Sequence, residues 1–195
     1  MAKAFKRKGD RFVARLDDVE REVVVGLLQQ TQDFLAPAHR EPTGDPFDDL
    51  VATLGVRPLD DPAPTPQVPP DPALERLLPT ANREDPVTAA EFRRLTEHGL
   101  RERKTANLAT AIAALLSADG DTVRLDQEQA QAMVVALTDV RLLLGERLGL
   151  RTDDDADALQ DRLEAASEDD PQLYLAAYYD FMTWLQESLT QALMS

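Results

Sequence analysis

The acidic run from Asp153 to Glu164 comes closest to a metal site in its residue types and spacing. Its carboxylates fall at positions 1, 3, 5, 9 and 12 of a twelve-residue loop, where an EF-hand places its calcium ligands. Position 6 should be glycine because the loop turns sharply there, and the sequence has Ala158 instead. Leu159 and Leu163 lie one helical turn apart, as expected of an acid-rich helix start that the helix dipole stabilises. We therefore predict a helix here and no metal site.

The sequence contains few of the residue types and none of the common motifs from which catalytic sites are built. Cysteine is absent, which removes disulfides, thiol catalysis, thiol redox sensing and zinc–thiolate sites together. His39 and His98 are the only histidines, and there is no catalytic triad, phosphate-binding loop or zinc-protease motif. Carboxylates are abundant but no pair stands out, so an enzyme with an unrecognised carboxylate site is kept only as an alternative. We predict no catalytic residue, no cofactor and no enzyme activity.

The first fifteen residues are the most basic stretch of a protein whose formal net charge is -15. The overall negative charge repels phosphate, which argues against non-specific binding to DNA or anionic lipid. Gly9-Asp10 predicts a turn, so the stretch is expected to form a hairpin. We interpret its cations as charges on a short outer strand, where they discourage edge-to-edge pairing with another sheet. The stretch would face the acid-rich residues 153–170 favourably if the fold brings the two together. The candidate nucleic-acid contacts are Lys6, Arg7, Lys8 and Arg11.

A second set of polar residues lies on the predicted helices. Residues 91–104 alternate acids and bases at i,i+3 and i,i+4, which is the pattern of a salt-bridged solvent face. Within them, Arg93–Lys104 is the second stretch through which a DNA-binding regulator could act. Arg141 falls on an apolar helix face, where a guanidinium needs a carboxylate or carbonyl partner, and we predict an ion pair there. The whole set, either an interaction site or a structural polar cluster, is Arg93, Arg94, Lys104, Asp139, Arg141, Asp180 and Trp184.

The sequence predicts that these residues are positioned by a mainly α fold. This fold is a multi-helix bundle with a small N-terminal β-hairpin. Residues 4–16 predict the hairpin, and Asp17 with Glu20 predicts a capping box for a helix that ends before Pro37. Residues 121–129 repeat the pattern, since Arg-Leu-Asp again joins a short strand to a helix. A strand–helix pseudo-repeat and a chance similarity both account for this. If the strands pair, residues 122–125 add a third strand.

Proline is concentrated in one region. Twelve of the thirteen prolines lie between Pro37 and Pro86, so no long helix or central strand is expected there. We interpret residues 37–85 as a Pro-rich, partly extended excursion from a single helical domain that spans residues 1–195. Two short helices interrupt it, at 45–55 and from Asp71-Pro72, each with an aspartate cap and proline at the first helical position.

Three longer helices complete the prediction. The first runs from Pro86 to Ser117 with a break or kink near Gly99. The second, from Gln127 to about Gly149, is apolar on more than one side, which is typical of a helix in the middle of a bundle. The third starts at Asp170-Pro171. Its apolar stripe, with Trp184 at the edge, is Tyr174, Tyr178, Phe181, Met182, Leu185, Leu189 and Leu193.

The hydropathy of the chain predicts the cellular compartment of the protein. No run of about 18 apolar residues is present, so no membrane-spanning helix is expected. The basic N-terminus is not followed by the apolar segment of a signal peptide. We therefore expect a cytoplasmic protein without a membrane partner.

Four segments taken together resemble a known family. They are FKRKGDRFVARLDDVEREVVVGLLQQ (5–30), EFRRLTEHGLRERKTANLATAIAAL (91–115), ALTDVRLLLGERLGL (136–150) and YYDFMTWLQESLTQAL (178–193). The combination resembles an actinobacterial domain-of-unknown-function family that includes the oxidative-stress transcriptional regulator AosR. The resemblance covers nearly the whole chain outside the Pro-rich region.

The resemblance implies a non-enzymatic cytoplasmic regulatory protein that acts through protein–protein contact. It implies a sigma factor or another transcription component as the partner. Nucleic acid, through the basic stretches, and a second copy of the chain are further candidates that do not rest on the resemblance. The redox switch of the regulator is attributed to a cysteine pair, and this sequence has no cysteine. No redox-active residue is therefore carried over, and direct thiol sensing of oxidants is excluded.

Overall fold

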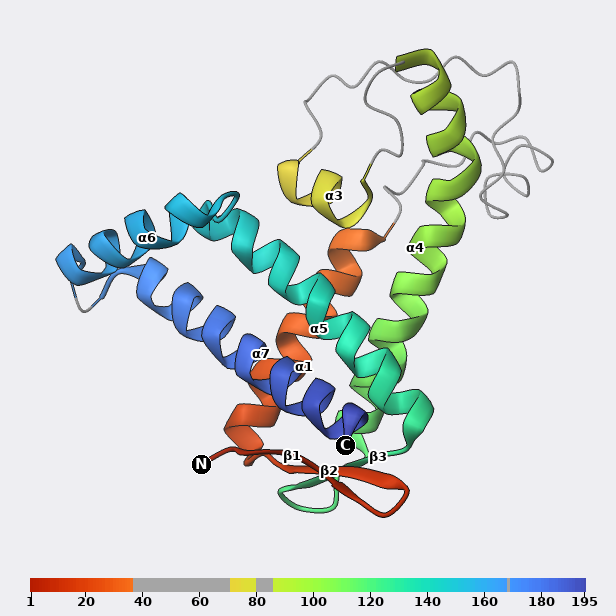
Figure 1. Ribbon diagram of the computed structural model, residues 1–195, viewed down its shortest axis with the longest axis vertical. Helices are drawn as coiled ribbons and strands as arrows, with labels where there is room; N and C mark the ends of the chain where they lie inside the picture. The colour runs from red at the N-terminus through yellow and green to blue at the C-terminus, as the bar shows by residue number, and fades with distance from the viewer. Residues whose placement is uncertain (37–70, 80–85, 168) are drawn as a thin grey trace, which may run out of the picture.

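The protein folds into a helical body that stands on a small antiparallel sheet (Figure 1). The structure, a computed structural model, describes residues 1–36, 71–79, 86–167 and 169–195, without the side chains of residues 86–96 and 153. Six helices and three strands lie in these ranges, which confirms the predicted mainly α fold class. The short helix predicted at 45–55 lies outside the described residues.

The sheet is built from two segments far apart in the sequence. β1 (Lys3–Lys8) and β2 (Arg11–Arg15) form the predicted hairpin. Residues 122–125 do supply the third strand that the sequence left open, since β3 (Thr122–Leu125) pairs antiparallel with β2. Gly9 closes the hairpin with φ of +67°, a left-handed conformation that glycine adopts without steric cost. The strand order β1-β2-β3 makes β2 the central strand and leaves β1 at one edge.

The same local device starts two helices directly after strands. Before α1 (Asp18–Leu35), Asp17 accepts from the Glu20 backbone N–H and Glu20 accepts from that of Asp17, each at 2.9 Å. Before α5 (Gln127–Leu148), Asp126 and Gln129 make the same reciprocal pair at 2.9 and 3.0 Å. Both capping boxes satisfy backbone donors that a helix start leaves without partners. Each strand therefore turns into its helix at a defined residue.

The helix α5 lies at the centre of the bundle. It packs against α1, α3, α4 and α7, and residues on different sides of it, such as Ala132, Leu137 and Val140, are all buried. This confirms the prediction made from its apolar circumference. α5 ends at Gly149, whose φ of +78° allows the left-handed C-cap and a turn away from the bundle.

Three further helices surround α5. α3 (Pro72–Leu77) starts after the predicted cap Asp71. α4 (Pro86–Leu116) is an uninterrupted helix, so the break predicted near Gly99 is wrong. α6 (Asp153–Ala165) begins at the acid-rich run, which confirms the helix start predicted there and excludes the loop geometry of an EF-hand.

The acidic α6 and the basic sheet lie at different ends of the molecule (Figure 1). The fold therefore does not bring the acid-rich residues 153–170 against the basic N-terminal stretch. The acids of α6 therefore do not neutralise the cations of the sheet, some of which pair with acids of the sheet's own loops. Only the acids next to the sheet therefore reduce the positive electrostatic potential of its cations.

The last helix, α7 (Pro171–Met194), lies beside α5 and reaches over the sheet. Met182, Leu185 and other members of its predicted apolar stripe are buried, but Tyr174 is 57% exposed, so the stripe is wrong at its start. Trp184, predicted at the edge, is 37% exposed. Neither α7 nor any other helix in the described ranges has the length and apolar character needed to cross a membrane.

One face of the sheet and part of its edge are covered by helices. Phe5, Phe12 and Val123 point into the core beneath them. The backbone N–H of Phe5, on the edge strand, donates to Ser188 Oγ of α7 at 3.2 Å, and this contact is buried. Because Ser188 of α7 accepts from this N–H, another strand cannot pair with the edge at Phe5. The lysines of β1 also discourage such pairing.

We expect Ser188→Ala to destabilise the protein by about 1–3 kcal/mol, because the Phe5 N–H is then buried without an acceptor. The measurement is the free energy of unfolding in urea. The matched control is Ser117→Ala, since the Ser117 hydroxyl is exposed and bonds only to the carbonyl of Ala114. We expect a change below about 0.5 kcal/mol for the control. Equal effects of the two substitutions would contradict the proposed closure of the edge.

Candidate binding surfaces

Two of the predicted polar residues form a buried ion pair between α4 and α5. Lys104 Nζ donates to Asp139 Oδ1, and Asp139 is only 1% exposed. Asp139 Oδ2 has no hydrogen-bond partner among the described residues. Burial raises the pKa of the Asp139 carboxyl, and the Lys104 ammonium opposes that shift. The pair lies between packed helices, so it joins α4 to α5 and offers no open position to a substrate.

Arg141 joins α5 to α7 through neutral partners. Its Nη1 donates to Gln186 Oε1 at 2.6 Å, and its guanidinium lies 5.4 Å from the centre of the Tyr179 ring. Gln186 in turn donates to Thr138 Oγ1 at 2.6 Å and to the Val134 carbonyl at 3.1 Å. The predicted ion pair is therefore wrong, because the acceptor is an amide oxygen. An amide satisfies a half-buried guanidinium without burying a second charge.

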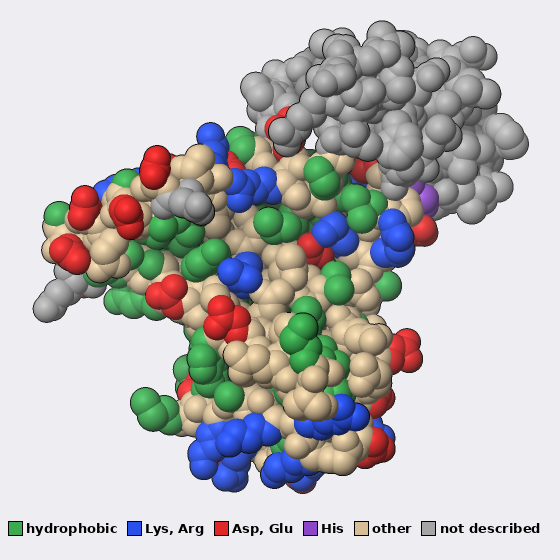
Figure 2. All heavy atoms as spheres, in the orientation of Figure 1, with side chains coloured by type: hydrophobic (Ala, Val, Ile, Leu, Met, Phe, Trp, Pro, Cys, Tyr) green, Lys and Arg blue, Asp and Glu red, His purple; other side chains and the backbone are tan. Residues whose placement is uncertain are grey.

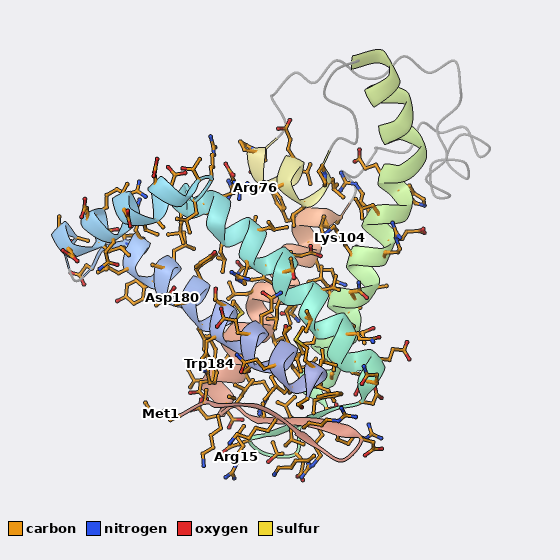
Figure 3. All side chains as sticks on the ribbon, in the orientation of Figure 1. Met1, Arg15, Arg76, Lys104, Asp180 and Trp184 are labelled. Carbon is orange, nitrogen blue, oxygen red and sulfur yellow. The ribbon has the colours of Figure 1, made fainter. Side chains whose placement is uncertain are left out.

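The structure describes the side chains of five of the seven predicted residues, and it does not bring these five together. Figure 3 shows Asp180 and Trp184 on α7, well away from Lys104. Asp180 is exposed, and neither Asp139 nor Arg141 contacts it. Arg93 and Arg94 belong to α4, but their side chains are outside the described residues. The set divides into a buried pair, an inter-helix hydrogen-bond network and exposed residues of α7.

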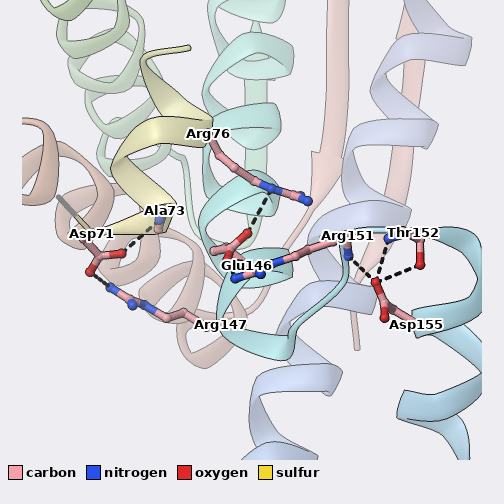
Figure 4. Close-up of polar contacts among 8 residues, drawn as sticks. All are labelled: Asp71, Ala73, Arg76, Glu146, Arg147, Arg151, Thr152 and Asp155. Carbon is pink, nitrogen blue, oxygen red and sulfur yellow. Dashed lines mark hydrogen bonds and ion pairs between the residues drawn. The ribbon is translucent and has the colours of Figure 1, made fainter. Parts of the chain in front are cut away.

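A further set of ion pairs, which the sequence patterns did not single out, fastens α3 to the end of α5 (Figure 4). Glu146 accepts from Arg76 Nε and Arg151 Nε, each at 3.0 Å. Beside it, Arg147 Nη2 donates to Asp71 Oδ2 at 2.6 Å and thereby lowers the pKa of the Asp71 carboxyl. The only signal of these ion pairs in the sequence was that Glu146 and Arg147, of opposite charge, are adjacent near the end of a predicted helix. Their partner helix is known only from the tertiary structure.

The start of α6 is also held by local hydrogen bonds (Figure 4). Asp155 Oδ2 accepts from the backbone N–H groups of Arg151 at 2.9 Å and Thr152 at 2.7 Å. These donors lower the pKa of the Asp155 carboxyl because they stabilise its charged form. The carboxylate thus caps a helix, and no group of acidic or histidine side chains in the described ranges is arranged to hold a metal ion.

The face of the sheet that points away from the helices is basic. Strand alternation, with a register shift in β1 between Lys3 and Lys6, points one set of side chains outward. The charged side chains of this set are exposed, and Val13 and Thr122 are half-buried. Figure 2 shows Lys and Arg side chains gathered at the end of the molecule that the sheet forms, and Figure 3 shows Arg15 directed away from the helices. Packing onto the sheet comes from α4, α5 and α7 on the opposite face. The outward cations, called the basic face below, are Lys3, Lys6, Lys8, Arg11, Arg15 and Arg124.

Three of the four candidate nucleic-acid contacts belong to the basic face. Arg7 does not, because its Nη1 donates to the carbonyl oxygen of Ser195 at 2.6 Å and its guanidinium lies 6.0 Å from the Phe12 ring centre. It therefore fastens the end of α7 to the hairpin. Arg124, on β3, is a member that the sequence reading missed, although strand alternation at residues 122–125 placed it opposite the buried Val123 and Leu125.

The second exposed feature is a row of aromatic side chains along α7. Phe181 and Trp184 stack with their ring centres 5.9 Å apart and their planes at 16°. Tyr178 is half-buried one turn before them, and Tyr174 is exposed at the start of the helix. The spacing of three or four residues places these rings on one side of the helix. The members of this aromatic row are Tyr174, Tyr178, Phe181 and Trp184.

The fold and its surfaces define a mainly helical protein whose described part exposes two surfaces with the chemistry of binding sites. Comparison with known proteins then places the chain in a family. It belongs to the DUF2017 family, because the model of this domain of unknown function matches residues 2–193. No curated protein and no solved structure matches the chain.

We expect Lys104→Met to destabilise the protein by about 3–5 kcal/mol near neutral pH, because it leaves the Asp139 carboxylate buried without its partner. Burial raises the pKa of Asp139 in the folded state, so the folded protein takes up this proton at a higher pH than the unfolded chain. The stability gained from the protonated form is therefore lost as pH rises through the folded pKa. The loss caused by the substitution should be smaller at about pH 5 than at about pH 7, as measured by urea unfolding.

The double variant Lys104→Met/Asp139→Leu is the control for this pair. It should recover most of the lost stability, because a buried ion pair can be replaced by apolar side chains at little cost. A loss that is the same at both pH values, or a double variant no more stable than Lys104→Met, would contradict a buried pair with a raised carboxyl pKa.

Proposed function

We propose that this protein is a non-enzymatic cytoplasmic regulator that acts by binding another protein. The observation that carries the proposal is the aromatic row on α7. Trp and Tyr are the residues most enriched at the energetic centres of protein–protein interfaces, because they supply a large apolar area with few rotatable bonds. A stack of Phe181 and Trp184 left partly in water is unusual for a surface that serves only solubility.

The charges beside the aromatic row define the chemistry of the partner. Asp180 and Glu187 are exposed on the same helix, and α6, which packs against the first half of α7 at Ala176, is acid-rich. A partner that covers the row therefore combines apolar side chains with lysine or arginine at the rim. From Tyr174 to Trp184 the row is about 15 Å long at 1.5 Å per residue, which suits about three turns of an amphipathic helix.

The resemblance to regulators such as AosR supports the class of partner. It favours a sigma factor or another transcription component, which would contact this protein through a basic amphipathic segment. The chain has no cysteine, so the contact is not controlled by a thiol switch, and regulation in oxidative stress would need a signal from elsewhere. The buried position of Asp139 and Lys104 supports the absence of catalysis by that pair.

We expect Trp184→Ala to weaken binding of the partner at least about thirtyfold, the effect of losing a residue at the centre of an interface. The partner is recovered from the native host with the wild-type protein as bait, identified, purified and titrated. Because Trp184 is the only tryptophan of the chain, its emission should move to shorter wavelength when a partner without tryptophan covers it.

Leu116→Ala is the matched control, since Leu116 is a 65% exposed apolar residue on a different helix. This variant should bind as the wild type does, and Tyr174→Ala should weaken binding in the same direction as Trp184→Ala. A partner set that contains no transcription component, or one that Trp184→Ala leaves unchanged, would count against the proposed function.

A further inference from the structure

We propose that the basic face of the sheet is a second docking site, which binds a short extended acidic segment of a partner protein. The site is a half-buried apolar side chain, Val13, surrounded by cations on the central and neighbouring strands. It goes beyond the proposed function, because it lies on the sheet and uses none of the residues of the aromatic row.

The strand register gives this arrangement. Val13 is paired across the hairpin with Lys6 and across the other ladder with Arg124, so one cation stands on each side of it. Along β2, Arg11 and Arg15 are its neighbours on the same face, two residues away in each direction. Four cations therefore surround one apolar side chain on a flat surface. In a protein with a net charge of -15, this pattern is not a consequence of average composition.

The spacing of the site matches an extended peptide. Alternate residues of a strand are about 7 Å apart, and neighbouring strands are about 5 Å apart. A segment with an acidic, an apolar and an acidic residue at alternate positions can place its apolar side chain on Val13 and its carboxylates over the flanking cations. The edge of β1 is occupied at Phe5 by Ser188, so the proposal places the segment across the face and not as a further strand beside β1.

The rim of the sheet favours a short segment over a nucleic acid. Asp10 lies 3.9 Å from Arg11, Asp126 lies 3.6 Å from Arg11, and Asp119 lies 3.5 Å from Arg124. Asp17 and Asp121 border the other end, where they share a shallow hollow with Lys3 and Arg15. A duplex longer than the sheet would place phosphates over these acids. The face also carries no outward aromatic ring in the described residues, so it lacks the stacking platform that single-stranded nucleic acids use.

The experiment uses the full chain and a labelled peptide whose sheet-facing positions are Glu, Leu and Glu, separated by threonine. Fluorescence anisotropy at low salt should show binding that weakens as salt is added, because the contacts are exposed ion pairs. The same peptide with glutamine in place of glutamate should bind at least about tenfold more weakly. Lys6→Gln/Arg124→Gln should weaken binding of the acidic peptide by a similar factor.

The control variant Arg103→Gln/Arg162→Gln removes the same charge from α4 and α6 and should leave peptide binding unchanged. Trp184→Ala should also leave it unchanged, so failure here is distinguishable from failure of the contact proposed on α7. Equal losses of peptide affinity in the two double variants would mean that only the overall charge of the protein matters. That result would overturn the inference. Tighter binding of a 20-base-pair DNA duplex than of the peptide would overturn it as well.

Discussion

The burial of α5 on most of its circumference is the constraint on which the rest of the structure depends. Polar side chains that a helix carries into the core need partners inside the protein. Asp139 pairs with Lys104 of α4 through Oδ1, and Arg141 with Gln186 and Tyr179 of α7, although Asp139 Oδ2 and Arg141 Nε have no hydrogen-bond partner among the described residues. Each polar contact thus joins α5 to a different neighbour.

The same requirement gives these residues a structural role between helices. A carboxylate with a raised pKa is often a sign of function, but here the ammonium that faces it comes from a packed helix. At the end of α5 the ion pairs of Glu146 and Arg147 extend the pattern to α3. Polar chemistry in the described core therefore holds helices together, and the chemistry available to a partner lies on the sheet and on α7.

The surfaces follow from what the core leaves uncovered. A three-stranded sheet packed on one side turns a second set of residues away from the core, and here most of those residues are cations. α7 packs one side against α5 and the sheet, which leaves Tyr174 and Trp184 of its aromatic row exposed and Tyr178 and Phe181 half-buried. The two surfaces have opposite chemistry, one basic and flat, the other apolar with an acidic rim.

Local signals in the sequence were sufficient for the elements. Asp17 with Glu20 makes its capping box from residues within one helical turn, and Gly9 sets the hairpin turn, so neither depends on distant neighbours. The pairing of residues 122–125 with β2 could be suggested because both strands end in Arg-Leu-Asp. The break predicted at Gly99 was wrong because tertiary packing on α1 and α5 outweighs the weak helix preference of one glycine.

The sequence by itself determined the fold class, the helix starts and the basic character of the first strands, because caps, turns and alternation act over a few residues. Only the tertiary structure decided which polar residues meet. Lys104 and Asp139 are 35 residues apart and Arg141 and Gln186 are 45 residues apart, and no local pattern encodes such contacts. It also decided that Arg7 leaves the basic face for Ser195 while Arg124 joins it. The physical reason is that partner choice depends on how the helices pack in three dimensions, which periodicity along the chain does not specify.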